Sequence, residues 1–236
     1  MTYEHIVDRI IDLLRCAGAV QGNSSPTPWN AFLRLSSLIH DAYEIPSTTF
    51  TPMMRRLLFA LGFAAQPQTV VGIGTYVGYT FSWLLRDRRD SESNPFPEMA
   101  VGMDVDESAN QLARRNCSVL NHGTRLSFLD GDGITLLTRL ETPIDLLYID
   151  VDDPVVGKGG YRQVIETASS LLSPGALVLA HDACVPKFAA DFAAYNGYVK
   201  RCEIFRDTWI FPVDDCGLSV TAVSNEKANT RHDRQG

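Results

Sequence analysis

From Thr69 onward the chain alternates short apolar runs, rich in β-branched residues, with segments of helical periodicity. The runs are TVVGIG (69–74), MAVGMDV (99–105), RLSFLDG (125–131), IDLLYIDV (144–151) and ALVLAHD (176–182). Hydrophobic residues at consecutive positions are typical of strands that are covered on both faces. Alternation of such strands with helices indicates right-handed crossovers, and therefore predicts an α/β fold with a mainly parallel sheet.

The C-terminal part of the chain has no helical segments between its apolar runs. VKRCEIFR (199–206), TWIFPV (208–213) and GLSVTAV (217–223) follow one another with only turn-like separators such as VDDCG. Short separators favour antiparallel pairing, so we place these runs at one edge of the sheet. The predicted fold is a Rossmann-like three-layer α/β/α sandwich, with a mainly parallel seven-stranded sheet and an antiparallel C-terminal edge.

Apolar residues at helical spacing precede the first strand. They predict amphipathic helices over residues 3–20 and 29–42, and MMRRLLFALGFAA (53–65) predicts a third helix. The final segment, SNEKANTRHDRQG, has no apolar face and predicts a flexible tail. We therefore expect an N-terminal helical extension (1–48), a core domain (49–223) and a tail (224–236).

Composition and charge exclude several classes of partner. Hydrophobic residues make up 45% and charged residues 21% of the 236 positions, which is an ordinary globular mix. The formal net charge of -7 opposes binding to phosphate backbones and anionic lipid, so we expect neither nucleic acid nor a membrane as a partner. Five cysteines without a CxxC pair, and charged residues within the first apolar stretch, favour a cytoplasmic protein without a secretory signal.

Glycine-rich or polar residues follow each predicted strand, at the edge where doubly wound sheets bind ligands. After the first strand, the glycines of residues 72–80 (GIGTYVGYT) allow a sharp turn and close approach of a ligand to the backbone. The second strand ends at Asp104, whose carboxylate could accept two hydrogen bonds from a ribose diol. The last glycine interval is one residue longer than in G-x-G-x-x-G, which disfavours a dinucleotide and hydride transfer.

Five motifs occur in a characteristic order: VVGIGTYVGYT, GMDVDE, LDGDG, DLLYIDVDDPVVGKGGY and LLSPGALVLAHDA. Their order resembles that of the class I S-adenosylmethionine-dependent methyltransferases, and within them the catechol O-methyltransferase-like group. The resemblance covers residues 49–223 and implies that this domain binds S-adenosylmethionine. It also implies that the N-terminal extension serves as a substrate lid or as the interface of a homodimer.

The resemblance implies two sets of site residues. The cofactor would be bound by the glycine turn, by the ends of the next two strands and by Asp150, that is by Ile73, Gly74, Thr75, Gly78, Tyr79, Thr80, Asp104, Val105, Gly131, Asp132 and Asp150. The catalytic set would be Asp150, His181 and Asp182, which in metal-dependent members matches the site of a divalent ion such as Mg²⁺. Two carboxylates and an imidazole could bind such an ion or act without metal as hydrogen-bond acceptors and base, and the sequence leaves both open.

The sequence departs from the family pattern at two positions. Gly72 stands where the family has an acidic residue that recognises the amino group of the cofactor, and Asp153 replaces the lysine that deprotonates the acceptor. We expect His181 to act as the base, because a neutral imidazole titrates near working pH and Asp182 could orient it. Lys158 lies in a GKGG segment, for which we expect a flexible loop.

The predicted function is methyl transfer from S-adenosylmethionine to a small-molecule acceptor, with O-methylation in natural-product biosynthesis as the expected reaction. The alternatives are metal-free C- or N-methylation of a small metabolite, and an inactive cofactor-binding interaction subunit. Aromatic candidates for the acceptor pocket are Trp29, Phe32, Tyr43, Phe50, Tyr161, Trp209 and Phe211. Core packing is the competing interpretation of each of these residues.

Overall fold

A computed structural model describes residues 1–21, 25–45, 50–85, 97–120, 123–152 and 157–225. Within these ranges seven strands form one sheet, namely β1 (Thr69–Ile73), β2 (Met99–Asp104), β3 (Arg125–Asp130), β4 (Ile144–Ile149), β5 (Leu172–His181), β6 (Phe205–Phe211) and β7 (Leu218–Val223). The order across the sheet is β3-β2-β1-β4-β5-β7-β6, and β7 runs antiparallel to both of its neighbours. The predicted seven-stranded, mainly parallel sheet with an antiparallel C-terminal edge is confirmed.

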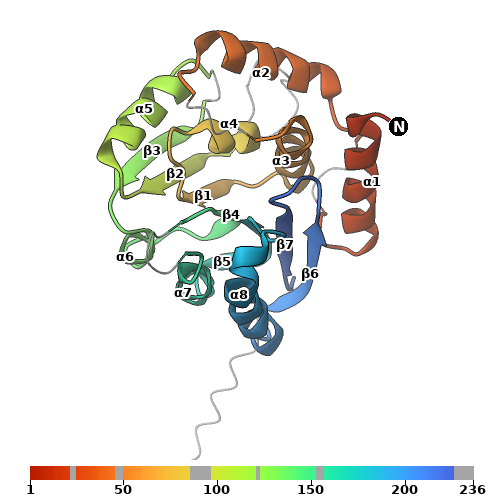
Figure 1. Ribbon diagram of the computed structural model, residues 1–236, viewed down its shortest axis with the longest axis vertical. Coiled ribbons are helices and arrows are strands. Elements are labelled where there is room, and N and C mark those ends of the chain that lie inside the picture. Colours follow the sequence, from red (N-terminus) through yellow and green to blue (C-terminus); the bar gives the residue numbers. More distant parts are fainter. Residues whose placement is uncertain (22–24, 46–49, 86–96, 121–122, 153–156, 226–236) are drawn as a thin grey trace, which may run out of the picture.

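Helices cover both faces of the sheet, which gives the predicted three layers (Figure 1). One face carries the helices of the N-terminal half: α1 (Tyr3–Cys16), α2 (Trp29–Ala42), α3 (Pro52–Ala65), α4 (Tyr79–Leu85) and α5 (Glu107–Cys117). The other face carries α6 (Gly133–Leu137), α7 (Gly160–Ala168) and α8 (Ala189–Arg201). None of the helices in the described ranges is both long and apolar enough to cross a bilayer.

Successive residues of the central strands face two separate apolar cores. Val70 and Tyr148 belong to the core under α1–α5, whereas Val71 and Ile149 belong to the core under α6–α8. All four side chains are fully buried. Burial on both faces explains why these strands carry hydrophobic residues at consecutive positions.

The N-terminal helices belong to the first core. The ring of Phe32 in α2 lies 5.5 Å from that of Phe59 in α3 and 5.3 Å from that of Trp83 in α4. The helix α3 begins at Pro52, where the hydroxyl of Thr51 accepts a hydrogen bond from the amide of Met54. All three expected helices are therefore present, while the role of residues 1–48 as lid or dimer interface stays a prediction.

The C-terminal edge differs from the prediction in one element. We expected a strand over residues 199–206, but Val199–Arg201 form the end of α8 and β6 starts only at Phe205. Lys200 and Arg201 occupy the last turn of that helix, where cationic side chains interact favourably with the helix dipole. Two strands rather than three therefore build this edge. The predicted tail from residue 226 onward lies outside the described residues.

Candidate functional site

The strands β1 and β4 lie side by side at the point where the order of the sheet reverses. Gly74 follows β1 with a φ of +76°, and a Cβ atom at this position would overlap the carbonyl oxygen of Asp150. The amide of Asp150 in turn donates a hydrogen bond of 2.8 Å to the carbonyl oxygen of Ile73. Only glycine allows this contact, which holds the carboxyl ends of the two strands together at the switch point.

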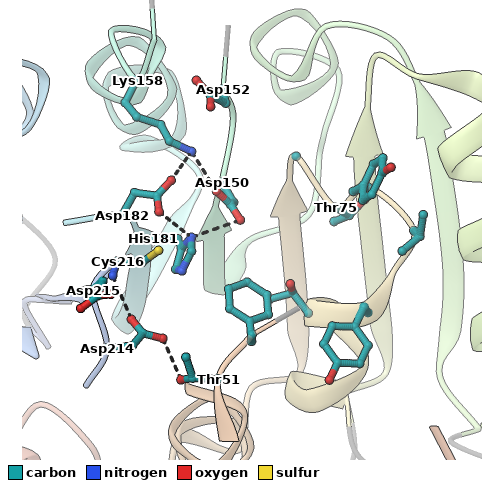
Figure 2. Close-up of a pocket in the computed structure, with 16 residues that line it drawn as sticks. Thr51, Thr75, Asp150, Asp152, Lys158, His181, Asp182, Asp214, Asp215 and Cys216 are labelled. Atoms are coloured by element: carbon teal, nitrogen blue, oxygen red, sulfur yellow. Dashed lines mark hydrogen bonds and ion pairs between the residues drawn. The ribbon is translucent and has the colours of Figure 1, made fainter. Parts of the chain in front are cut away.

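A cavity of about 900 Å³ opens at these strand ends (Figure 2). It is bordered by the glycine turn, by the ends of β4 and β5, by the start of α3 and by the β6–β7 connection. Its lining residues are Phe50, Thr51, Gly74, Thr75, Tyr76, Val77, Tyr79, Thr80, Asp150, Asp152, Lys158, His181, Asp182, Asp214, Asp215 and Cys216. The glycine turn and the polar residues after β4 and β5 therefore share one cavity.

Thr75 fills the space that two glycines leave open. A Cβ atom at Gly72 would lie 2.6 Å from Cγ2 of Thr75 and 3.0 Å from the ring of Phe81, and one at Gly102 would lie 2.8 Å from Oγ1 of Thr75. The side chain of Thr75 thus occupies the volume beside Gly72 where the family has an acidic residue. Thr75 is only 3% exposed, and its buried hydroxyl, which faces Gly102, has no hydrogen-bond partner among the described residues.

Asp104 joins the end of β2 to the glycine turn. Its Oδ2 accepts a hydrogen bond of 2.8 Å from the amide of Tyr76, and its Oδ1 accepts one of 3.0 Å from the amide of Asp106. Each carboxylate oxygen has two lone pairs, so Asp104 can still accept hydrogen bonds from a diol.

The structure brings only part of the predicted cofactor set into the cavity. Gly74, Thr75, Tyr79, Thr80 and Asp150 line it, while the remainder lie outside its lining: Ile73, Gly78, Asp104, Val105, Gly131 and Asp132. The side chain of Val105 is 77% exposed, and that of Asp132 caps α6 by accepting a hydrogen bond from the amide of Thr135. The remaining residues cluster along the ends of β1, β2 and β3, beside the cavity.

Lys158 and His181 join the carboxylates of Asp150 and Asp182 into a closed ring (Figure 2). The Nζ atom of Lys158 lies 2.9 Å from Oδ1 of Asp150 and 2.8 Å from Oδ2 of Asp182. Nδ1 of His181 lies 3.4 Å from Oδ2 of Asp150 and 3.3 Å from Oδ1 of Asp182. Every oxygen of the two carboxylates therefore has a nitrogen of Lys158 or His181 beside it.

The expectation that Lys158 lies in a flexible loop is wrong. Its side chain is 1% exposed, and Nζ lies 5.3 Å from the ring centroid of Tyr161 and 5.5 Å from that of Phe188. The amide of Lys158 also donates a hydrogen bond of 3.2 Å to Asp191 in α8. Packing of the lysine against the aromatic rings and pairing of its ammonium group with carboxylates fix this side chain.

The ring sets the charge of its members. Burial is the largest single effect on the pKa of His181 and by itself would lower it, but Asp150, Cys216 and Asp182 together outweigh burial and raise this pKa to about 10. Burial would raise the pKa of Asp150, yet His181 and Lys158 hold that pKa well below its usual range. Burial also disfavours the ammonium form of Lys158, but Asp150 and Asp182 raise the pKa of Lys158 above its usual value. The raised pKa of His181 favours the protonated ring, a hydrogen-bond donor, over the neutral imidazole that we expected, and the role of His181 as the base stays a prediction.

The residues predicted to hold a divalent ion do not fit one. A metal needs ligand lone pairs that point to one centre, but here the ammonium group of Lys158 bridges the two carboxylates. The hydroxyl of Tyr148 donates to Oδ2 of Asp150, and Nδ1 of His181 lies 3.3–3.4 Å from the second oxygen of each carboxylate. Among the described residues, His181, Asp182 and Cys216 place one possible ligand atom each within 4.8 Å of one another, and Asp150 is not in this group. The oxygens of Asp182 are already engaged in the ring, so this second group does not offer a complete site either.

Two aromatic rings form one wall of the cavity. Phe50 is stacked on Tyr79 with ring centroids 6.4 Å apart and an interplanar angle of 7°. The Phe50 ring also contacts the His181 ring edge to face, with ring centroids 4.7 Å apart. Of the seven aromatic candidates from the sequence, Phe50 lines the cavity, whereas Phe32 and Tyr43 belong to the apolar core.

Sequence reasoning missed the β6–β7 connection as part of the site. Oδ2 of Asp214 accepts a hydrogen bond of 2.8 Å from the hydroxyl of Thr51, and Oδ1 accepts hydrogen bonds from the amides of Cys216 and Gly217. Two consecutive carboxylates in the turn VDDCG were a possible signal, because β7 pairs with β5 and its connection therefore lies near His181. Asp153, at the position of the family lysine, lies outside the described residues.

Comparison with known proteins finds similarity to methyltransferases. Residues 71–183 match a family model described as a methyltransferase domain. A protein of Mycobacterium sp. (strain JLS) named as an O-methyltransferase is 27% identical over 161 residues, which cover 67% of this chain and 68% of that protein. The catechol O-methyltransferase of Niastella koreensis is 23% identical over 140 residues, which cover 58% of each chain.

A solved structure shares the fold over almost the whole chain. The O-methyltransferase of Bacillus cereus, crystallised in complex with S-adenosylhomocysteine (SAH), has a TM-score of 0.63 and 16% sequence identity. The alignment covers 94% of this chain and 100% of that one. Residues 71–183 are thus similar in sequence to a methyltransferase domain, the relatives named above are O-methyltransferases, and the solved structure shows that the chain shares their fold.

Proposed function

We propose that this protein transfers the methyl group of S-adenosylmethionine to a hydroxyl oxygen of a small molecule bound in the cavity of about 900 Å³. One observation carries the proposal: the glycine turn at Gly74 and the ring of Lys158, Asp150, His181 and Asp182 line the same cavity. A donor held at the turn and an acceptor held at the ring would therefore be neighbours, and proximity supplies much of the catalysis of such a transfer. The setting we propose is natural-product biosynthesis, by analogy within the family.

The residues present fit the cofactor. When bound, S-adenosylmethionine supplies a methyl group that is already activated by a positively charged sulfur. The carboxylate of Asp104, which holds the amides of Tyr76 and Asp106, would accept further hydrogen bonds from its ribose. The carboxylates of Asp150 and Asp152 line the cavity and complement its positive charge.

The lining of the cavity suggests the class of acceptor. The stacked pair of Phe50 and Tyr79 offers a flat apolar wall to a planar molecule. The carboxylates of the lining outnumber its cationic side chains; the acidic residues are Asp150, Asp152, Asp182, Asp214 and Asp215. Because a negative cavity repels anions, we propose a neutral or cationic aromatic alcohol rather than a carboxylate or a phosphate ester.

His181 would act on the acceptor as a hydrogen-bond donor. The imidazole lines the cavity, and its Nε2 atom is buried without a hydrogen-bond partner among the described residues. A protonated ring can donate from Nε2 to the acceptor oxygen and stabilise the negative charge that forms when the hydroxyl loses its proton. That proton would leave to solvent at the rim of the cavity, where Tyr76 and Asp152 are exposed.

Three measurements test the proposal. Calorimetry should detect binding of SAH to the purified protein, and a protein without SAH affinity would contradict the cofactor assignment. Incubation with methyl-labelled S-adenosylmethionine and a panel of phenols should then label neutral and amine-bearing phenols in preference to their carboxylated analogues. Mass spectrometry of the product should place the label on oxygen, and label on nitrogen or carbon would refute O-methylation.

A further inference from the structure

We propose that Lys158 is a built-in cation that takes the place of a divalent metal ion at this site, so that the methyltransferase binds and converts its acceptor without metal. The catalytic half of this inference rests on the function proposed above. The binding half concerns only the ring of Lys158, Asp150, His181 and Asp182, and can be tested without an acceptor.

The position of the ammonium group carries the proposal. Nζ of Lys158 bridges one oxygen of Asp150 at 2.9 Å and one of Asp182 at 2.8 Å. An ion held jointly by these two carboxylates would need the same oxygens and the space between them, because Mg²⁺ binds its oxygen ligands at about 2.0–2.1 Å. The second oxygen of Asp150 accepts a hydrogen bond of 2.9 Å from the hydroxyl of Tyr148. Nδ1 of His181 lies 3.4 Å from that oxygen and 3.3 Å from the second oxygen of Asp182, without a hydrogen bond to either, and occupies the space beside both.

Moving Lys158 out of this position would cost free energy. Its side chain is almost fully buried, with Nζ near the rings of Tyr161 and Phe188 and the amide bonded to Asp191. A metal that displaced the ammonium group would break this packing and leave a buried cation without its partners. A metal that entered beside it would add two positive charges at short range to an existing one.

This arrangement gives Lys158 a positioning role. Its ammonium group fixes the carboxylates of Asp150 and Asp182, and these two carboxylates lie against Nδ1 of His181. Lys158 therefore acts through its neighbours and orients the imidazole toward the cavity. A divalent ion would hold the same carboxylates from the same side, which is why one cation can stand in for the other.

The test is a titration of the protein with Mn²⁺. Binding is measured by calorimetry and by the decrease of the electron paramagnetic resonance signal of the free ion. We expect no Mn²⁺ binding to the wild-type protein in the millimolar range. Lys158→Met removes the bridging cation, and we expect it to bind Mn²⁺ at least about tenfold more tightly than wild type. The conservative Lys158→Arg keeps a cation and should not gain affinity, and Lys200→Met, on the exposed side of α8, is the matched control.

Three outcomes would overturn the inference. Wild-type protein that binds Mn²⁺ and loses that binding in Asp150→Asn would show that the carboxylates are metal ligands. Folded Lys158→Met without any gain in Mn²⁺ affinity would show that the lysine does not occupy a metal position. If Lys158→Met does not fold, the turnover of wild-type protein after treatment with EDTA tests the inference instead. Unchanged activity supports the inference. Activity that is lost and then restored only by a divalent ion refutes it. A protein that binds neither SAH nor Mn²⁺ would instead contradict the proposed function alone.

Discussion

Replacement of Gly72 by alanine tests why this chain lacks the acidic residue that the resemblance leads us to expect. The added Cβ atom would lie 2.6 Å from Cγ2 of Thr75 and 3.0 Å from two ring carbons of Phe81. Overpacking of a buried site by one methyl group costs about 1–3 kcal/mol. Because Thr75 and Phe81 are both buried, we expect Gly72→Ala to lower the free energy of unfolding by this amount.

The contact with Thr75 predicts a compensating variant. Thr75→Ser removes Cγ2, which is the nearer of the two contacts, and on its own should cost about 1 kcal/mol for one buried methyl group. In the Gly72→Ala background the same change removes a clash as well, so the double variant should be no less stable than Gly72→Ala alone. The resulting coupling energy in a double-mutant cycle should be about 1 kcal/mol or more.

Urea denaturation followed by circular dichroism measures all four proteins of the cycle. Gly197→Ala is the matched control, since its Cβ would meet only the end of the Arg201 side chain at 3.4 Å and α8 should gain from alanine. Additive effects of Gly72→Ala and Thr75→Ser would refute the reasoning. They would mean that Thr75 does not occupy the volume of the missing acidic residue.

Three further predictions follow from the site. Asp104→Asn replaces one acceptor oxygen by a donor and should weaken SAH binding about 10–100-fold in calorimetry, and unchanged affinity would contradict the ribose assignment. Phe50→Ala removes the stacked wall and should raise the KM for the acceptor about 2–10-fold while SAH affinity, as the internal control, stays the same. His181 contributes stability that is fully present below pH 6.5 and lost as pH rises through its folded pKa of about 10. Urea denaturation between pH 7 and pH 10 should show this loss in wild type and not in His181→Gln.

The sheet could be predicted because its signal is local and repeated. Consecutive buried residues such as Val70 and Val71 fall in different cores, and this two-sided burial is what the apolar runs indicate. The segment at residues 199–206 was misassigned because the spacing of its apolar residues, Val199 among them, fits both the helical period and the strand period. The helical conformation of Val199 is decided by its packing in the core under α6–α8, and these eight residues alone do not reveal that packing.

The chemistry of the site was harder to predict because it depends on contacts between distant segments. Glycines flank Lys158 and favour a loop, but burial against Phe188 and pairing with Asp182 fix its side chain. The charge of His181 follows from its approach to Asp150, which comes from a different strand. The strand ends that carry both residues were predicted correctly, whereas the protonation state requires the distance between them.

The hydrogen bond between Thr51 and Asp214 connects two segments that both lie outside the matched domain of residues 71–183. Both residues line the cavity that the glycine turn also lines. One border of the cavity is thus assembled from sequence on either side of the matched domain. Under the proposed function, changes confined to these two segments would alter the choice of acceptor and leave the glycine turn unchanged.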